Sequence, residues 1–453
     1  MEQIKITNLA FLPSSGAGHI PSTIEFAKRL LLHPAATGRV HATLLLTPAA
    51  AASVSSLSIL IPSASLAISV YHLPSIDLPS LGATDGVVDL VSLSFQLYAT
   101  HVKSALAVID ASALIIDFFA TAVVDVAKDL NIPAYVFFAS NASMLALTLH
   151  LPALHDEILV QFEQFHGKIR VPGLAPIPPI SMPCSLLDKK SQCYFWYMYH
   201  AQRLKEVRGI LVNTLRALDE RALSAMALDG SNPPIHSVGP VLHLLTAGER
   251  HECLRWLDAQ PEATVVFLCF GSKGRMSAAQ AAEVATGIEC SRHRFLWSLW
   301  LADGEEKGLP VEFLEGTRER GMVWEGWVPQ MKVLGHEAVG GFVTHGGWNS
   351  SLESMWYGVP MVTWPMCAEQ HLNAFEMAVE MGVAAEMEVD RRRGGWVTAQ
   401  EVEKKVRWLM GETEEVKKVR ERVREMQLAS RAAVEMGGSA WEAMGSLLTE
   451  LLI

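Results

Sequence analysis

The stretch from Trp327 to Gln370, WVPQMKVLGHEAVGGFVTHGGWNSSLESMWYGVPMVTWPMCAEQ, decides how the second half of this chain folds. Its centre is an apolar run, Val339–Thr344, which is followed by a histidine, two glycines and a helix-like segment from Trp348. This order predicts a strand, a tight turn and a helix start. Glycine lets the backbone approach a ligand closely, and a helix start presents unpaired N–H groups and the positive end of a dipole. The stretch therefore predicts a site for a phosphate or pyrophosphate group.

Other side chains of the same stretch extend this anion site. Trp327 follows an apolar segment, and its indole can stack on a flat base for about 1–3 kcal/mol. Glu353 lies four residues after Asn349, on the same face of the expected helix, where a carboxylate can accept both hydroxyls of a ribose. Glu369 and Gln370 place a carboxylate beside a carboxamide, which suits a polyhydroxylated sugar. The stretch therefore predicts the binding of a base, a ribose, a diphosphate and a sugar.

These 44 residues resemble the signature box of the plant family-one UDP-glycosyltransferases. The chain departs from the family pattern at Glu369, where Asp is more common, and at Gly346, where many members have Cys. The resemblance implies that the box binds a UDP-sugar. It implies donor-binding roles for Ser15, Ser272, Trp327, Val328, Gln330, His345, Gly347, Trp348, Asn349, Ser350, Glu353, Glu369 and Gln370.

Several of these donor contacts leave an alternative open. His345 is expected to donate to the leaving diphosphate, but it can also be a strand-end histidine paired to backbone. Trp348 can pack under the glycine turn while its N–H reaches the sugar. Gln330 can face the base or ribose, or cap the turn after a proline. Ser272 resembles the family's other phosphate-contacting serine, although a Gly-Ser pair alone indicates only a turn.

The remaining apolar runs predict two α/β domains. The 453 residues exceed the roughly 250–300 at which a single core usually stops growing, and strand-like runs alternate with helical segments, which predicts parallel sheets covered on both faces. The resemblance implies two facing doubly wound Rossmann-like domains, the GT-B arrangement. The expected strands are residues 4–12, 40–47, 113–116, 132–138, 209–214, 265–270, 294–300, 321–324, 339–344 and 360–365.

The domain boundaries follow from composition. We expect an N-terminal acceptor-binding domain over residues 1–240, a linker over 241–250 in a stretch rich in Pro, Gly and His, and a UDP-sugar-binding domain over 251–436. Two glycines then break an amphipathic helical segment, and the resemblance implies that residues 437–453 pack back on the N-terminal domain. Two further segments are expected to be irregular: 171–184, which holds five prolines, and the basic run 391–395.

His19 and Asp117 are the candidate catalytic residues. Both follow apolar strands, and loops at the carboxyl ends of such strands converge at the ligand crevice of a doubly wound sheet. A carboxylate bonded to one ring nitrogen fixes the tautomer, which leaves the other nitrogen to take a proton from a substrate hydroxyl, a step worth about 10²–10⁴-fold. From spacing alone, the histidine can equally be a satisfied polar residue and the aspartate a helix cap. The resemblance favours catalysis, because the family has a Gly-x-Gly-His loop, matched by residues 16–19, and an Asp after an apolar strand, matched by 114–119.

The resemblance also implies an activity. It implies an inverting transfer of a hexose, expected to be glucose, from a UDP-sugar to a hydroxyl of a small phenolic or flavonoid-like acceptor. Phe118, Phe119 and Ser140 are expected to contact the acceptor, together with variable loops at 81–97 and 194–199. Three alternatives stay open: a C-glycosyltransferase acting on a phenolic acceptor, a UDP-sugar epimerase or hydrolase on the same architecture, and a nucleotide-sugar-binding protein without turnover.

Other classes are disfavoured. A nicotinamide-binding fingerprint needs a third glycine where Pro21 stands, and an acidic residue after the second strand, which ends in Thr47-Pro48. No Asp-x-Asp occurs, so we expect neither a metal on the diphosphate nor any cofactor besides the UDP-sugar co-substrate. The net charge of −11 argues against nucleic-acid and membrane-surface partners. The six cysteines form no C-x-x-C pair, the N-terminus lacks a signal-peptide pattern, and the stretch 57–73 is too polar for a membrane span. A cytoplasmic monomer is expected.

Overall fold

The structure, a computed structural model, describes residues 6–16, 18–53, 66–84, 86–243, 250–302, 304 and 308–452. The chain forms two compact units, one made of Met1–His243 with Ala432–Ile453 and the other of Leu244–Arg431. Four expectations fall partly outside the described residues: residues 4 and 5 of the first strand, Ala17 of the Gly-x-Gly-His match, 57–65 of the apolar stretch, and 244–249 of the linker. Among the described helices, none is both long and apolar enough to cross a membrane.

The first unit is built on a seven-stranded parallel sheet with the order β3-β2-β1-β4-β5-β6-β7. The strand order reverses between β1 and β4, which is the switch point at which doubly wound sheets bind ligands. The strands are β1 (Thr7–Leu12), β2 (Val40–Leu46), β3 (Ile68–His72), β4 (Ala113–Asp117), β5 (Ala134–Phe138), β6 (Gly209–Val212) and β7 (Ile235–Ser237).

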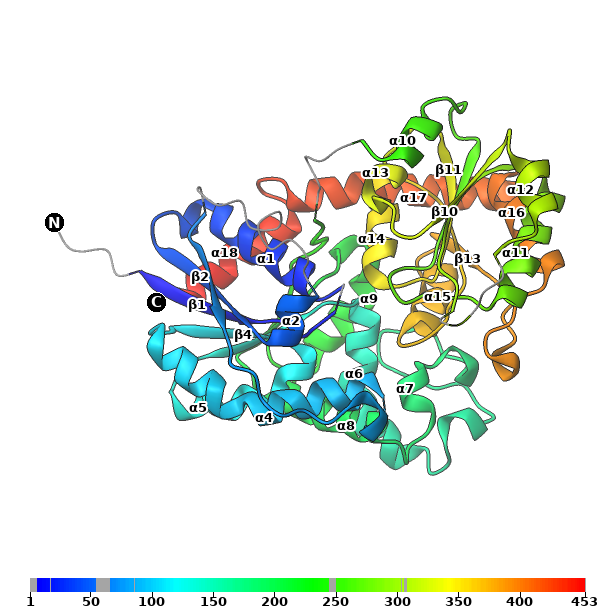
Figure 1. The fold of residues 1–453 in the computed structure, drawn as a ribbon. Coiled ribbons are helices and arrows are strands. Elements are labelled where there is room, and N and C mark those ends of the chain that lie inside the picture. Colours follow the sequence, from blue (N-terminus) through cyan, green and yellow to red (C-terminus); the bar gives the residue numbers. More distant parts are fainter. Residues whose placement is uncertain are drawn as a thin grey trace. The chain divides into compact units, whose positions relative to one another are not determined.

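Alternation along these strands sends side chains to both faces. Phe11 and Phe137 lie on one face and are fully buried in a cluster with Leu447 and Leu448 from the C-terminal helix α18 (Ser439–Leu451). Figure 1 shows α18 and α1 (Ile20–Leu32) on this side of the sheet, with α4 (Val87–Val108) and α5 (Val124–Asp129) on the other. The C-terminal helix is therefore part of the core of the first unit.

The other helices of this unit are α2 (Pro48–Ala52), α4 (Val87–Val108), α5 (Val124–Asp129), α6 (Ala142–Glu157), α7 (Cys184–Leu187), α8 (Gln192–Arg203) and α9 (Arg216–Leu228). Its 3-10 turns are η1 (Pro34–Ala36), η2 (Leu81–Ala83), η3 (Phe118–Val123), η4 (Phe162–Gln164), η5 (Pro179–Ser181) and η6 (Leu204–Glu206).

The second unit has a six-stranded parallel sheet with the order β10-β9-β8-β11-β12-β13, whose switch point lies between β8 and β11. Its strands are β8 (Val265–Cys269), β9 (Arg294–Leu299), β10 (Gly321–Glu325), β11 (Val339–Thr344), β12 (Met361–Thr363) and β13 (Ala384–Glu386). Its helices are α10 (Glu252–Leu257), α11 (Ala278–Ser291), α12 (Val311–Thr317), α13 (Gln330–Leu334), α14 (Trp348–Tyr357), α15 (Gln370–Val379) and α16 (Ala399–Met410), with the 3-10 turn η7 (Arg391–Arg393); α17 (Glu414–Val434) starts in this unit and ends in the other.

Two predicted loops are wrong. Residues 81–97 and 194–199 belong largely to the helices α4 and α8. In α4 the buried residues Phe95, Tyr98, Val102 and Ala105 recur every three or four positions, which is the apolar stripe of an amphipathic helix. The stretch rich in Pro, Gly and His that leads into the expected linker, residues 230–250, contains a strand, β7, which is too short to show a period of its own.

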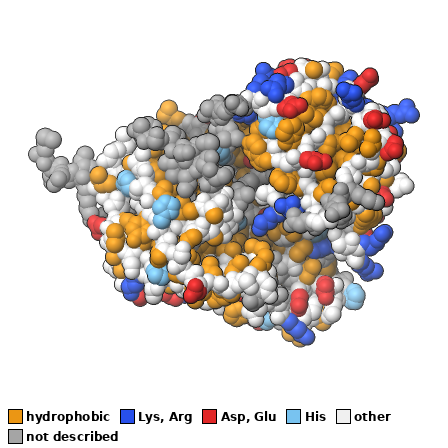
Figure 2. Space-filling model, in the orientation of Figure 1, with side chains coloured by type: hydrophobic (Ala, Val, Ile, Leu, Met, Phe, Trp, Pro, Cys, Tyr) orange, Lys and Arg blue, Asp and Glu red, His pale blue; other side chains and the backbone are white. Residues whose placement is uncertain are grey.

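Acidic and basic side chains are interspersed on the molecular face drawn in Figure 2, among scattered apolar ones. The basic run at Arg391–Arg393 forms the turn η7, none of whose residues is buried. The expected solvated loop at this place is therefore a solvated 3-10 turn.

Candidate functional site

The switch point of the first sheet brings His19 and Asp117 together. His19 is the N-cap residue of α1, and Asp117 is the last residue of β4 and the N-cap of η3. Because β1 and β4 are neighbours in the sheet, the two side chains meet across 98 positions, and His19 Nδ1 lies 2.7 Å from Asp117 Oδ2. The imidazole is about one-third exposed, whereas the carboxylate is buried. One ring nitrogen is thus held by a buried acid while the ring remains accessible.

The carboxylate of Asp117 is charged at neutral pH. Burial alone would raise the pKa of Asp117, but the charge and hydrogen bond of His19 and the N–H of Phe119 bring it below its ordinary value. The second oxygen, Oδ1, accepts that N–H at 3.0 Å. Asp117 is therefore both the cap of η3 and a hydrogen-bond partner of His19.

Aromatic rings surround this pair. The ring of Phe119 lies 5.8 Å from that of His19 and is half-buried, whereas Phe118 is buried. Ser140 follows β5, and its buried Oγ has no hydrogen-bond partner among the described residues. Ser15 is half-buried in the loop before α1.

In the second unit, the glycine turn after β11 forms as the sequence predicts. Gly346 has a φ of +75°, a backbone conformation that residues other than glycine rarely adopt. Gly347 is the N-cap of α14, and a Cβ there would lie 2.5 Å from His345 Nε2. The buried side chain of Asn373, on α15, donates to the carbonyl of Gly346 at 3.0 Å. The turn thus needs one glycine for its backbone and the other for space.

His345 sits at the end of β11 against the end of β8. Gly271 has φ +72°, and a Cβ there would lie 2.7 Å from His345 Nε2, so the two strand ends are packed in direct contact. Burial lowers the pKa of His345 to about 4. The ring is therefore neutral at pH 7 and can offer a single N–H to an anion. Ser272, the next residue after Gly271, is exposed in the same turn.

Glu353, Gln330 and Ser350 form one polar cluster. Gln330 Nε2 donates to Glu353 Oε2 at 2.7 Å and to Ser350 Oγ at 2.9 Å. Burial raises the pKa of Glu353 to about 7, against the lowering effect of the Gln330 hydrogen bond. Gln330 therefore supports the carboxylate, and it does not cap the turn, since the N-cap of α13 is Pro329 and no side chain of the described residues caps this helix.

The other predicted donor residues of the box differ in exposure. Trp327 is 63% exposed, whereas Trp348 and Val328 are each 2% exposed. An exposed indole can stack on a flat base, whereas Val328 is closed to solvent. Asn349 is half-buried in the first turn of α14.

Glu369 and Gln370 lie where α15 begins. Glu369 is the N-cap residue and half-buried. The carboxamide oxygen of Gln370 accepts the N–H groups of Met366 at 2.9 Å and Cys367 at 3.0 Å. That oxygen therefore closes its own loop, and the NH₂ group of Gln370 donates to Cys367 Sγ at 3.5 Å.

Comparison with known proteins places this geometry in a family. A family model described as UDP-glucoronosyl and UDP-glucosyl transferase matches residues 243–413. Malvidin galactosylase UGT88C3 of Oryza sativa subsp. indica is 41% identical over 98% of this chain and 97% of that protein. The chain belongs to the plant family-one UDP-glycosyltransferases. It is a UDP-dependent glycosyltransferase, as the signature box predicts.

Two further relatives show the range of this family. Baicalein 7-O-glucuronosyltransferase of Scutellaria baicalensis is 40% identical over 83% of this chain and 89% of that protein. A UDP-glucosyltransferase from Polygonum tinctorium capable of glucosylating indoxyl superposes with a TM-score of 0.91 at 32% identity, covering 99% of each chain. The α/β fold with two parallel Rossmann-like sheets is thereby confirmed as the GT-B fold of this glycosyltransferase family.

Three residues beside the predicted family positions were not found from the sequence. Gly271 leaves room for the His345 ring, Asn373 donates to the glycine turn, and His200 is buried beside Phe118 and Phe119. A glycine after an apolar strand signals a tight turn, so Gly271 had a signal. The other two are set by tertiary contacts only.

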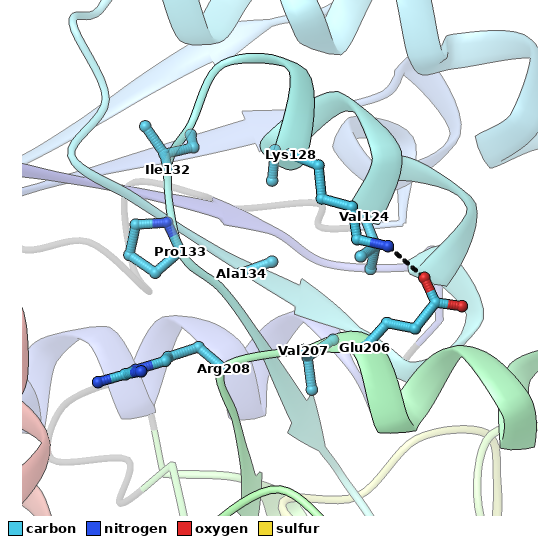
Figure 3. A pocket seen from close by; sticks show the side chains of 9 residues that line it. Val124, Lys128, Ile132, Pro133, Ala134, Glu206, Val207 and Arg208 are labelled. Carbon is cyan, nitrogen blue, oxygen red and sulfur yellow. Dashed lines mark hydrogen bonds and ion pairs between the residues drawn. The ribbon is translucent and has the colours of Figure 1, made fainter.

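A surface pocket of about 310 Å³ lies elsewhere in the glycosyltransferase. It is lined by Pro133 and Arg208 at the amino ends of β5 and β6, and by the Lys128–Glu206 ion pair (Figure 3). His19 follows β1 and Asp117 ends β4, so both lie at the carboxyl ends of the strands, at the opposite edge of the sheet. This pocket is therefore not part of the candidate site.

Proposed function

We propose that this glycosyltransferase moves a hexose from a UDP-sugar to a hydroxyl of a small phenolic, flavonoid-like acceptor, with inversion at the anomeric carbon. The observation that carries the proposal is the 2.7 Å contact between His19 Nδ1 and Asp117 Oδ2. In this mechanism the Nε2 atom of His19 takes the acceptor proton. Asp117 holds the tautomer and stabilises the imidazolium that forms.

The reaction is a single displacement. As His19 takes the proton, the acceptor oxygen forms a bond to the anomeric carbon, and the bond from that carbon to the diphosphate oxygen breaks. One displacement at one carbon inverts its configuration, so an α-linked donor gives a β-glycoside. The proton ends on His19, and the negative charge ends on UDP.

The second unit supplies the donor contacts in this proposal. The neutral ring of His345 and the N–H groups at the start of α14 suit the charge of the leaving diphosphate. Glu353, held by Gln330, accepts the ribose hydroxyls, and exposed Trp327 stacks on the uracil. Glu369 and the NH₂ group of Gln370 contact the sugar.

The remaining predicted donor residues complete this set. Ser15 and Ser272 are proposed to contact the phosphates. The other proposed contacts come from the start of α14 and from the backbone before α13, through Val328, Gly347, Trp348, Asn349 and Ser350.

The proposed acceptor class rests on the aromatic lining and on the relatives. Phe118 and Phe119 present rings next to His19, which favours a flat aromatic acceptor, and Ser140 offers a buried hydroxyl. Relatives are named for malvidin, baicalein and indoxyl. Glucose is the sugar proposed for this chain because Gln370 closes the box, although these relatives are named for galactosyl, glucuronosyl and glucosyl transfer.

Parallel incubations test the proposal. The protein is given UDP-glucose, UDP-galactose or UDP-glucuronate with a panel of phenols and flavonoids, and products are recorded by mass and acid stability. An acid-labile glycoside formed fastest from UDP-glucose supports the proposal, whereas an acid-stable product indicates C-linkage. Free sugar or an epimer formed without an acceptor would indicate hydrolysis or epimerisation, and UDP-sugar binding without any product would indicate a binding protein.

A further inference from the structure

A buried histidine that the proposed mechanism does not use lies behind the His19–Asp117 pair. His200, on α8, is fully buried, and both of its ring nitrogens are hydrogen-bonded. Its Nδ1 lies 2.6 Å from Thr121 Oγ1 on η3, and its Nε2 lies 2.9 Å from Ser92 Oγ on α4. One imidazole therefore links three elements that are far apart in the sequence.

The ring of His200 is neutral at working pH. Burial lowers the pKa of His200 to about 3, although the charge of Asp117 opposes this shift. Its ring lies 5.0 Å from that of Phe118 and 6.0 Å from that of Phe119, centroid to centroid. A neutral, fully bonded ring that is completely buried has no access to a substrate, so it cannot act as an acid or base in the reaction.

The element that His200 holds is the turn that begins at Asp117. The turn η3 spans only Phe118–Val123, and Asp117 is its N-cap. Thr121 stands four residues after Asp117 and is itself fully buried, so its hydrogen bond to His200 anchors the middle of the same short turn. A displacement of this turn would move the carboxylate relative to His19, and would move Phe118 and Phe119 with it.

We propose that His200, through Thr121, is a positioning residue that sets the place of Asp117 against His19. This inference rests on the proposed function, because Asp117 must act on the reaction through His19. The two hydroxyls on the imidazole have unequal effects in this arrangement. Thr121 lies on a turn of six residues that is capped by Asp117, whereas Ser92 lies on the 22-residue helix α4.

This inequality gives a matched pair of variants. Thr121→Val and Ser92→Ala each remove one hydroxyl and leave one buried ring nitrogen unpaired, so they are expected to lower the melting temperature by similar amounts. Thr121→Val should lower kcat by about 10–100-fold, since small misplacements of catalytic groups have effects of this size, and leave UDP affinity unchanged. Ser92→Ala should change kcat by no more than about twofold. Thr121→Ser keeps the hydroxyl and should therefore have a kcat close to that of the wild type.

A double variant shows whether the effect passes through Asp117. In an Asp117→Asn background, Thr121→Val should lower kcat no further, because the group that it displaces is already inactive. Equal losses of kcat in Thr121→Val and Ser92→Ala, or losses that multiply in the double variant, would overturn the positioning role. If Asp117→Asn alone leaves kcat unchanged, the proposed function itself fails, and the two failures are thus distinguished.

Discussion

The replacement Asp117→Asn tests the proposed catalytic pair with little effect on the fold. The carboxamide oxygen can still accept the N–H of Phe119, now 3.0 Å from Oδ1, and Asn caps helices as well as Asp does. At the position of Oδ2, however, an NH₂ group would face His19 Nδ1 at 2.7 Å. A donor at this place favours the tautomer that carries its proton on Nε2, the nitrogen that must be free to act as the base.

The magnitude follows from the loss of that base. General base catalysis is worth about 10²–10⁴-fold, which corresponds to about 2.7–5.4 kcal/mol of transition-state stabilisation. We expect kcat for glycoside formation to fall by this factor, while the affinity for UDP, measured by calorimetry, stays within about twofold. A variant that keeps more than a third of wild-type kcat would refute the catalytic role of the pair. An equal loss of UDP affinity would show that Asp117 serves donor binding instead.

Three further predictions concern donor binding and the core. Burial raises the pKa of Glu353 to about 7, and only the charged carboxylate is expected to accept the ribose hydroxyls. UDP affinity, measured by titration calorimetry, should therefore rise about tenfold from pH 6 to pH 8. In Glu353→Gln the remaining pH dependence should be that of UDP itself. In the ligand-free protein the sign is opposite, since a carboxyl with a raised pKa stabilises the fold less as pH climbs from about 4.5 to 7. Gly271→Ala should lower the free energy of unfolding by about 1–2 kcal/mol because residue 271 has a left-handed backbone. It should also weaken UDP binding by about tenfold or more, because the new Cβ would meet His345. Gly308→Ala, which has open space around it, should change neither quantity. Leu447→Ala should lower the free energy of unfolding by about 2–5 kcal/mol because this side chain of α18 is fully buried, while Leu228→Ala, at an 88% exposed position, should have little effect in the same denaturant titration.

The sequence predicted the structure best where a continuous apolar run is followed by glycines, which mark a tight turn at the end of a strand. The runs at 265–270 and 339–344 gave β8 and β11 almost to the residue, because buried parallel strands are continuous apolar segments. Short edge strands such as β7 and β13, with three residues each, have no period to detect.

Contacts between distant elements were out of reach of this reasoning. Nothing in the local sequence around Ser92, Thr121 or His200 indicates that they meet, since the segments are brought together only by the packing of α4 and α8. The same holds for Asn373, whose amide closes the glycine turn from the next helix. From the sequence alone, a polar residue in an amphipathic helix is predicted to face solvent unless its hydrogen-bond partner on another element is known.

The two units use one topology for opposite electrostatic purposes. In each, the groups proposed to be functional lie at the carboxyl ends of the two strands that flank the switch point: His19 and Asp117 at β1 and β4, and Gly271 and His345 at β8 and β11. In the first unit a histidine meets a buried carboxylate, which stabilises a proton on the ring and so suits a base. In the second unit His345 packs against Gly271 and Gly347 and lies 3.4 Å from the uncharged hydroxyl of Thr344, and burial keeps the ring neutral. The proposed function places a diphosphate at these strand ends, and a carboxylate at position 271 would repel that anion, whereas Gly271 adds no charge.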